Sequence, residues 1–139
     1  MGPDRIAGNA FYRIPRGAIG YMGRLFYSQN MSAVTGCCMM VKAELFAEMG
    51  GFDPSYQAAF GDVDFCLKVR QAGKLVVWTP YAEAYYLESK GKEGKKGNHR
   101  GGFAQDCKLF RERWSEVLDA GDPYYNPNFT LDTYSFEIL

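Results

Sequence analysis

The chain has 139 residues, of which 47% are hydrophobic and 23% charged, so its composition is globular rather than disordered or fibrous. Sixteen Lys and Arg balance sixteen Asp and Glu, and this zero net charge excludes a whole-chain attraction to nucleic acid or anionic lipid. The four cysteines form no CxxC pair, so neither a zinc site nor a disulfide framework is indicated, and a reducing compartment is expected. We predict a single domain over residues 1–139 without a transmembrane segment.

The first half of the chain contains two patterns typical of helices. Residues 1–30 are rich in glycine and aromatic residues without a lasting period, which predicts turns and short edge strands. The nearly uncharged stretch 31–41 predicts a buried strand interrupted at Gly36. Residues 42–49 have helical spacing and are followed by Gly50 and Gly51, which predicts a helix with a glycine stop. Residues 62–72, closed by Gly73, predict a second helix.

The second half predicts strands, a loop, a third helix and a tail. Residues 75–79 and 82–87 are β-branched or aromatic and flank Pro80, which favours two strands or one broken edge strand. Residues 90–102 hold five glycines and five Lys or Arg against one acid, which predicts a mobile basic loop. Helical spacing returns over 103–118, and residues 119–139 predict an extended tail packed on the body. The expected class is α/β, with helices packed on a small mixed sheet.

Two carboxylates, Asp62 and Asp64, flank Val63 at the start of the predicted second helix. Residues two apart on an α-helix point about 200° apart, so both side chains cannot face one small ligand. Only one of them is therefore expected to do chemistry. The alternative is a structural role, because aspartate at a helix start satisfies free N–H groups and meets the positive end of the helix dipole.

Several short motifs occur in a fixed order and give the chain a family resemblance. They are Thr35-Gly36, Gly-Gly-Phe-Asp at 50–53, Gly61-Asp62-Val63-Asp64, Ala72-Gly73 and Thr79-Pro80. This order resembles the C-terminal half of glycosyltransferase family 2 enzymes with the GT-A fold. Arg113-Trp114 and the Asp-Pro-Tyr-Tyr-Asn-Pro-Asn of 122–128 are similar to the ends of bacterial members that build cell-surface polysaccharides. The resemblance implies a partial GT-A fold whose N-terminal half is missing from these residues.

The resemblance also assigns roles to residues of the acceptor side. The family's catalytic base maps onto Asp62, which would take a proton from an acceptor hydroxyl in an inverting transfer. Asp64 is expected to orient the acceptor or to cap the helix. Thr35 and Gly36 are expected to line the floor of the acceptor site, with a strand bulge as the alternative. Trp114 is a candidate sugar platform, although the core is the commoner place for a tryptophan at this spacing.

The donor side is less complete. The basic loop is expected to contact the donor diphosphate through Lys90, Lys92 and Arg100, and the alternative is a solvated charged loop. The resemblance implies a divalent cation, Mg²⁺ or Mn²⁺, held mostly by residues outside this chain, and no metal ligand is assigned here. Tyr86 stands where relatives often carry a metal-binding histidine, and His99 is expected to be solvated rather than a ligand.

These residues predict the C-terminal part of an inverting glycosyltransferase, inactive by itself. The parent would move a sugar from a nucleotide-sugar donor to a glycan acceptor in cell-surface polysaccharide synthesis. We expect a cytoplasmic location with peripheral contact at the inner membrane face, and self-association as a homo-oligomer through an exposed apolar face. The alternative is a non-catalytic carbohydrate- or partner-binding module of the same shape. A nucleic-acid binder is disfavoured by the neutral charge.

Overall fold

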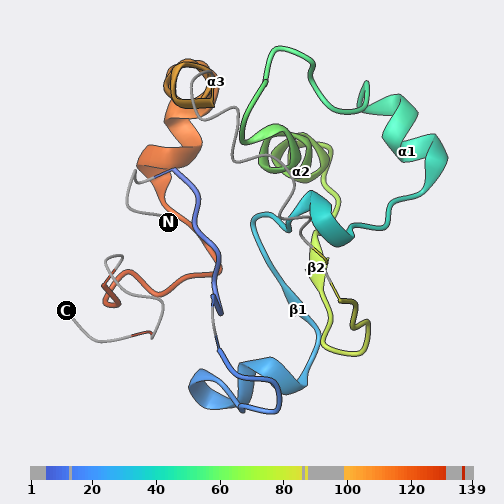
Figure 1. Ribbon diagram of the computed structural model, residues 1–139, viewed down its shortest axis with the longest axis vertical. Coiled ribbons are helices and arrows are strands. Elements are labelled where there is room, and N and C mark those ends of the chain that lie inside the picture. The colour runs from blue at the N-terminus through green and yellow to red at the C-terminus, as the bar shows by residue number, and fades with distance from the viewer. Residues whose placement is uncertain (1–5, 13, 86, 88–98, 131–135, 137–139) are drawn as a thin grey trace.

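The computed structural model describes residues 6–12, 14–85, 87, 99–130 and 136. Helix α2 lies at the centre, with α1 on one side and α3 on the other, and a strand pair below it (Figure 1). In chain order, the elements are η1 (Tyr21–Phe26), β1 (Gln29–Asn30), η2 (Gly36–Cys38), α1 (Ala43–Glu48), α2 (Gly61–Gln71), β2 (Val77–Trp78) and α3 (His99–Ala120), where η denotes a 3-10 helix.

The first two α-helices confirm the prediction from helical spacing and glycine stops. Helix α1 ends before Gly50 and Gly51, and α2 before Gly73, and all three glycines have φ between 66 and 74°. This left-handed region is open to glycine without steric cost, so the chain can turn away from each helix there. The glycines therefore set both helix lengths.

Helix α2 is buried on two sides, which makes it the centre of the packing. One apolar cluster, which we call the α2–α3 core, consists of Ile6, Leu67, Cys107, Phe110 and Trp114. The second, the α1–α2 core, consists of Phe65, Cys66, Val69 and Val76 with partly buried side chains of α1. A helix with apolar residues on two faces is typical of a central element rather than a surface one.

Helix α3 begins at His99 and ends at Ala120, so it is longer than the predicted 103–118. Its backbone departs from helical values at Trp114, where φ is −115° and ψ is 22°. The predicted apolar positions Cys107, Phe110 and Trp114 are buried. The helical period therefore identified the buried face of α3 but not its first turn.

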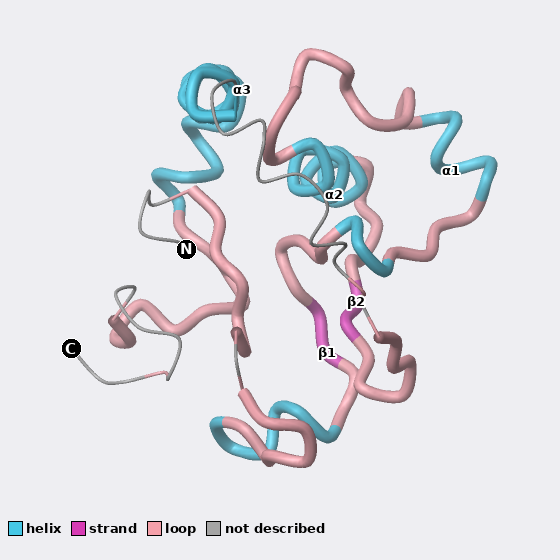
Figure 2. Tube along the Cα trace, viewed as in Figure 1, coloured by secondary structure: helices cyan, strands magenta, loops and turns pink. Residues whose placement is uncertain are grey.

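The sheet is smaller than expected. In the described residues it is one antiparallel pair, with Gln29 opposite Trp78 and Asn30 opposite Val77 (Figure 2). The predicted mixed sheet is not seen there, and the strand predicted over 75–79 is reduced to β2. The prediction of a strand over 82–87 was wrong for the described residues of that range, because they pair with no strand among the residues that the structure describes. A strand needs a hydrogen-bonded neighbour, which local sequence does not supply.

The stretch 31–41 is mostly irregular, so the prediction of a buried strand was wrong. Thr35 Oγ1 accepts a hydrogen bond from Cys37 N at 3.3 Å and caps η2, which turns the chain at Gly36. Apolar side chains of the stretch, among them Val34 and Met39, still pack against α2. Their hydrophobicity reflects contact with a helix rather than membership of a sheet.

The described residues of the C-terminal tail include turns, and their aromatic side chains contact the N-terminal segment. Phe129 and Phe136 are buried, and Phe136 stacks on Tyr21 with ring centroids 5.6 Å apart. The Arg24 guanidinium lies 5.3 Å from the Phe136 ring centroid, which adds a cation–π contact. An aromatic cluster thus joins the two ends of the described chain.

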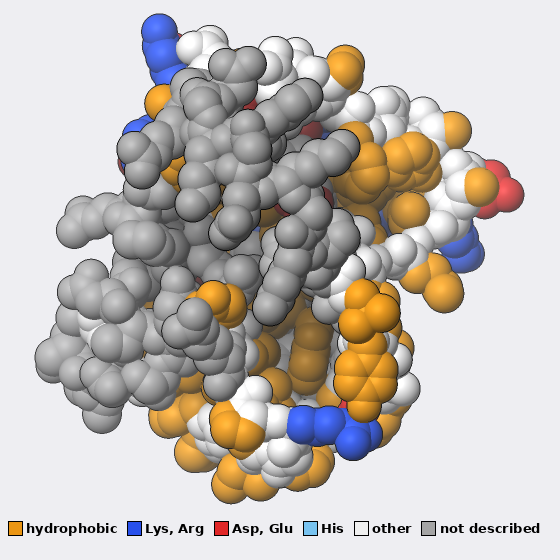
Figure 3. All heavy atoms as spheres, viewed as in Figure 1, with side chains coloured by type: hydrophobic (Ala, Val, Ile, Leu, Met, Phe, Trp, Pro, Cys, Tyr) orange, Lys and Arg blue, Asp and Glu red, His pale blue; other side chains and the backbone are white. Residues whose placement is uncertain are grey.

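Large apolar side chains are exposed at several places on the surface. Hydrophobic side chains gather around η1, at the bottom of the view in Figure 3, and include Met22, which is 79% exposed. Met40 is 99% and Leu75 64% exposed at other positions. Such exposure is the kind of surface on which the prediction of self-association rests.

The two glycines after α1 give a matched stability test. Gly50→Ala should lower the free energy of unfolding by about 1 kcal/mol, because alanine is strained at the φ of 74° found there. Gly51→Ala should cost more, because its Cβ would also lie 3.1 Å from Phe46 Cε1, whereas a Cβ at Gly50 meets nothing within 4 Å. Urea denaturation of both variants measures the difference, and equal losses would contradict the close packing of Phe46.

Candidate functional site

Asp62 lies in the first turn of α2 beside an open pocket of about 390 Å³. Its Oδ2 accepts a hydrogen bond from Gly36 N at 2.7 Å, and its Oδ1 accepts one from Val63 N at 2.9 Å. An ionised carboxylate has about four acceptor positions, so two such bonds fix its orientation without saturating it. The other residues that line the pocket are Gly36, Phe52, Tyr56, Gln57, Ala58, Ala59, Phe60 and Gly61.

Position 36 has little room for a side chain opposite Asp62. A Cβ there would lie 3.3 Å from Asp62 Cβ, which is closer than most real Cβ contacts, and 3.6 Å from its Oδ2, which is ordinary van der Waals contact. Gly36 therefore allows the backbone N–H to reach the carboxylate. Thr35 is exposed and caps η2, so of this predicted pair only Gly36 lines the pocket.

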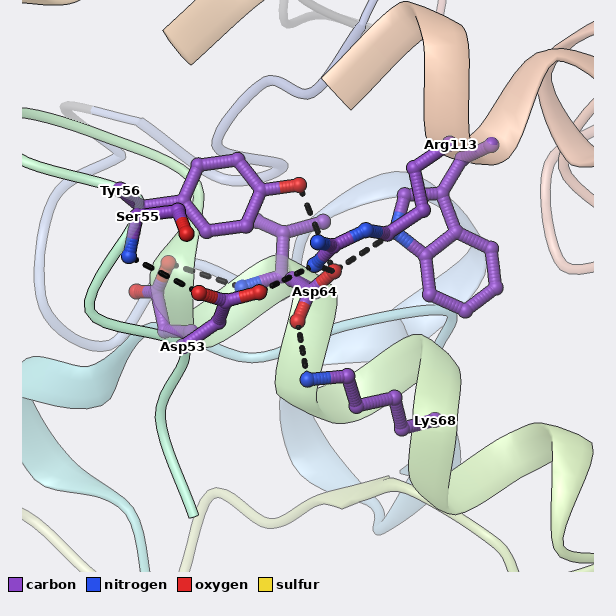
Figure 4. Close-up of polar contacts among 9 residues, drawn as sticks. Asp53, Ser55, Tyr56, Asp64, Lys68 and Arg113 are labelled. Atoms are coloured by element: carbon purple, nitrogen blue, oxygen red, sulfur yellow. Dashed lines mark hydrogen bonds and ion pairs between the residues drawn. The ribbon is translucent and has the colours of Figure 1, made fainter. Parts of the chain in front are cut away.

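Asp64 faces the other way and is fully buried. Its Oδ1 accepts hydrogen bonds from Arg113 Nη1 at 2.9 Å, Trp114 Nε1 at 2.9 Å and Tyr56 Oη at 3.3 Å (Figure 4). Its Oδ2 has no well-directed hydrogen bond but forms an ion pair with Lys68 Nζ at 2.8 Å. The two carboxylates thus have different surroundings, as the helical period predicts.

Arg113 joins Asp64 to the turn after α1. The same Nη1 atom donates to Asp53 Oδ2 at 2.6 Å, and Asp53 Oδ1 accepts from Ser55 N at 2.8 Å. The hydrogen bonds from Ser55 and Arg113 lower the pKa of Asp53, and the two carboxylates raise the pKa of Arg113. Burial and the nearby Asp64 charge raise the pKa of Tyr56 to about 12, so it remains a hydrogen-bond donor at neutral pH.

Opposing effects act on the charge state of Asp64. Burial raises its pKa, but the ion pair with Lys68 and the hydrogen bonds from Trp114 and Arg113 outweigh this and lower the pKa below the ordinary 3.8. Asp64 is therefore ionised and fully engaged with protein groups. It supports α2 from inside, and it does not line the pocket beside Asp62.

The structure identifies a third carboxylate, Asp106 on α3, that the sequence analysis missed. Its side chain is 1% exposed and accepts hydrogen bonds from three successive backbone N–H groups. Gln57 N lies 3.2 Å from Oδ1 and 3.1 Å from Oδ2, while Ala58 N and Ala59 N lie 2.7 and 2.8 Å from Oδ2. Burial raises the pKa of Asp106, but these three donors outweigh it and the pKa is lowered. No sequence pattern within α3 signals this role.

The residue between this loop and α2 is strained. Phe60 has φ 66° and ψ −2°, a left-handed conformation that costs a non-glycine residue about 1–2 kcal/mol. Its ring packs on Phe110 and Phe103 of α3, with centroids 5.3 and 5.7 Å apart. Strain of this kind persists where the surroundings hold it, and functional sites are common among such places.

Of the remaining predicted site residues whose side chains the structure describes, Trp114 does not line the Asp62 pocket. Trp114 is 4% exposed and belongs to the α2–α3 core, so the core alternative describes its position. It also lines a second pocket of about 380 Å³ with Arg70, Lys74 and Tyr124. Lys90, Lys92 and Tyr86 lie outside the described residues. Arg100 and His99 are described only as backbone in the first turn of α3.

Among the described residues, no three His, Cys, Asp or Glu side chains come together as a metal site. None of the helices in the described ranges combines the length and hydropathy of a membrane span. The cysteines carry no disulfide: Cys37 and Cys38 are exposed thiols, and Cys66 and Cys107 are buried.

Comparison with known proteins places the chain near enzymes of polysaccharide synthesis. It is 40% identical over 139 residues to an uncharacterized protein, y4gI, of Sinorhizobium fredii, covering 98% of this chain and 15% of that protein. It is 30% identical over 132 residues to O-antigen biosynthesis protein RfbC of Myxococcus xanthus, covering 94% and 10% respectively. A 77-residue match at 27% identity to the N-acetylglucosaminyl-diphospho-decaprenol L-rhamnosyltransferase of Mycobacterium tuberculosis covers 55% and 25%.

These names support a relationship between this chain and glycosyltransferases. The chain spans between a tenth and a quarter of the length of these relatives. No protein-family model and no solved structure matches it.

Three carboxylates with lowered pKa values predict a specific acid sensitivity. The pKa values of Asp53, Asp64 and Asp106 are all lowered in the folded chain, so the unfolded chain binds more protons in acid. Their contribution to stability should be complete above about pH 5 and should fall progressively as the pH drops below the ordinary carboxyl pKa. Urea denaturation between pH 7 and pH 3 measures this slope. Asp106→Asn should flatten it, and an unchanged slope in that variant would contradict the assignment.

Proposed function

We propose that the chain is the acceptor-side, C-terminal half of an inverting family 2 glycosyltransferase with the GT-A fold. The observation that carries the proposal is the placement of Asp62, which lines an open pocket with its carboxylate held by two backbone amides. The similarity to the rhamnosyltransferase and to the O-antigen biosynthesis protein supports the same reading. The acceptor is a glycan in cell-surface polysaccharide synthesis.

Asp62 acts as the general base in this proposal. One of its free lone pairs accepts the proton of an acceptor hydroxyl, and the hydroxyl oxygen forms a bond to the anomeric carbon of the donor sugar. The bond from that carbon to the nucleoside diphosphate breaks on the opposite face, so the configuration inverts. The amides of Gly36 and Val63 keep the carboxylate oriented through the reaction. A base placed in this way contributes about 10²–10⁴ in rate.

In this proposal, some of the other predicted residues support the acceptor site and the rest bind the donor diphosphate. Gly36 forms part of the acceptor floor, and Thr35 supports it through the cap of η2. Asp64 and Trp114 orient the site indirectly, because their polar atoms bond to each other inside the core. Lys90, Lys92 and Arg100 contact the donor diphosphate. The divalent cation is held by a nucleotide-binding half outside these residues, which makes the chain inactive by itself.

The proposal places the enzyme in the cytoplasm, with peripheral contact at the inner membrane face. The exposed apolar side chains described above support an association with other protein surface, either the nucleotide-binding half or a second copy of the chain.

Asp62→Asn tests the assignment of the base. In the full-length gene product that carries these residues, the variant should lower kcat for sugar transfer by about 10²–10⁴-fold and leave the KM for the nucleotide-sugar unchanged. The reason is that asparagine keeps the shape and the acceptor oxygen but cannot take the proton. Initial rates of nucleoside diphosphate release measure the effect.

The matched control is Asp119→Asn, an exposed carboxylate near the end of α3 that should leave kcat unchanged. Full transfer by Asp62→Asn would contradict the base assignment and favour the carbohydrate-binding module. Turnover of a nucleotide-sugar by the isolated 139 residues would contradict the proposal that they are inactive alone.

A further inference from the structure

The loop 57–59 forms a concave row of three backbone N–H groups, and the Asp106 carboxylate fills it. Such rows of successive N–H groups are anion-binding sites in proteins. Here the anion is the carboxylate of Asp106 on α3, which lies 47 to 49 residues after the three loop residues in the sequence. The loop itself, with two alanines and a glutamine, has no acidic side chain, so α3 supplies the group that accepts from these N–H groups.

The same loop forms the wall of the Asp62 pocket. Gln57, Ala58 and Ala59 all line it, and Phe60 and Gly61 connect them directly to Asp62. Phe60 precedes the first residue of α2, Gly61, and has a left-handed conformation. The hydrogen bonds to Asp106 on one side and the ring contacts with α3 on the other hold that turn in place.

We infer that Asp106 is a positioning residue for Asp62: by filling the N–H row of 57–59, it sets the turn that aims the first residues of α2 into the pocket. The inference rests on the proposed role of Asp62. Its consequence is that Asp106 contributes to the geometry of the site without touching substrate. Misplacement of a reacting group by about 1 Å is enough to lower a rate by about 10²-fold.

Asp106→Ala with formate rescue tests this inference on the 139-residue chain. The substitution leaves a space of carboxylate size next to three unpaired N–H groups, and formate has the matching shape and charge. Amide hydrogen exchange at 57–59 should accelerate by about tenfold or more in the variant. Hydrogen exchange of the Gly36 amide, which donates a hydrogen bond to Asp62, should also accelerate. Formate should restore protection at both places in a saturable manner.

A purely structural role would give a different pattern. Loss of general stability would accelerate exchange across α2 alike, including the Ala72 amide that bonds to Lys68 O, and formate would restore nothing. Asp106→Asn gives a second variant that keeps one acceptor oxygen and should show a smaller acceleration at 57–59. Glu116→Gln, at an exposed position of α3, is the control on which formate should have no effect.

The outcomes separate this inference from the proposed function. Unchanged exchange at 57–59 in Asp106→Ala, or acceleration there without any change at Gly36, would overturn the inference whatever the activity of Asp62→Asn. Formate-dependent protection together with full activity of Asp62→Asn would support the positioning of Asp62 by Asp106 and contradict only the assignment of Asp62 as the general base.

Discussion

The buried carboxylate of Asp64 is the constraint on which the rest of the structure depends. A charge without solvent is costly unless donors surround it, so Asp64 can be buried only when Arg113, Trp114, Tyr56 and Lys68 are in place. Three of these donors come from outside α2. Burial of one side chain thus requires the turn after α1, helix α2 and helix α3 to assemble together.

This constraint also explains why Asp62 faces outward. The two carboxylates lie on opposite sides of α2 because they are two residues apart on a helix, so fixing Asp64 in the core directs Asp62 to the pocket. There it meets backbone amides and open space instead of cations. One short motif therefore supplies both an internal anchor and an accessible base.

Sequence reasoning succeeded where local periodicity determines structure. Helices α1 and α2, their glycine stops and the opposed directions of Asp62 and Asp64 all follow from the helical period. It overestimated the strands over 75–79 and 82–87, because pairing depends on a neighbour distant in sequence, and it was wrong in 31–41, where apolar side chains pack on a helix. The role of Asp106 could not be predicted from the sequence, because it depends on the backbone conformation of a loop that is distant in the chain.

The most direct measurement of the central claim compares the free energy of unfolding of Asp64→Asn with that of Asp62→Asn. Removal of one partner from a buried ionic network costs about 3–5 kcal/mol, and this loss is predicted for Asp64→Asn. Asp62→Asn should cost about 1 kcal/mol, because it weakens only two hydrogen bonds of a partly exposed side chain. Equal losses, or a larger loss at Asp62, would contradict the claim that Asp64 is the structural anchor of α2.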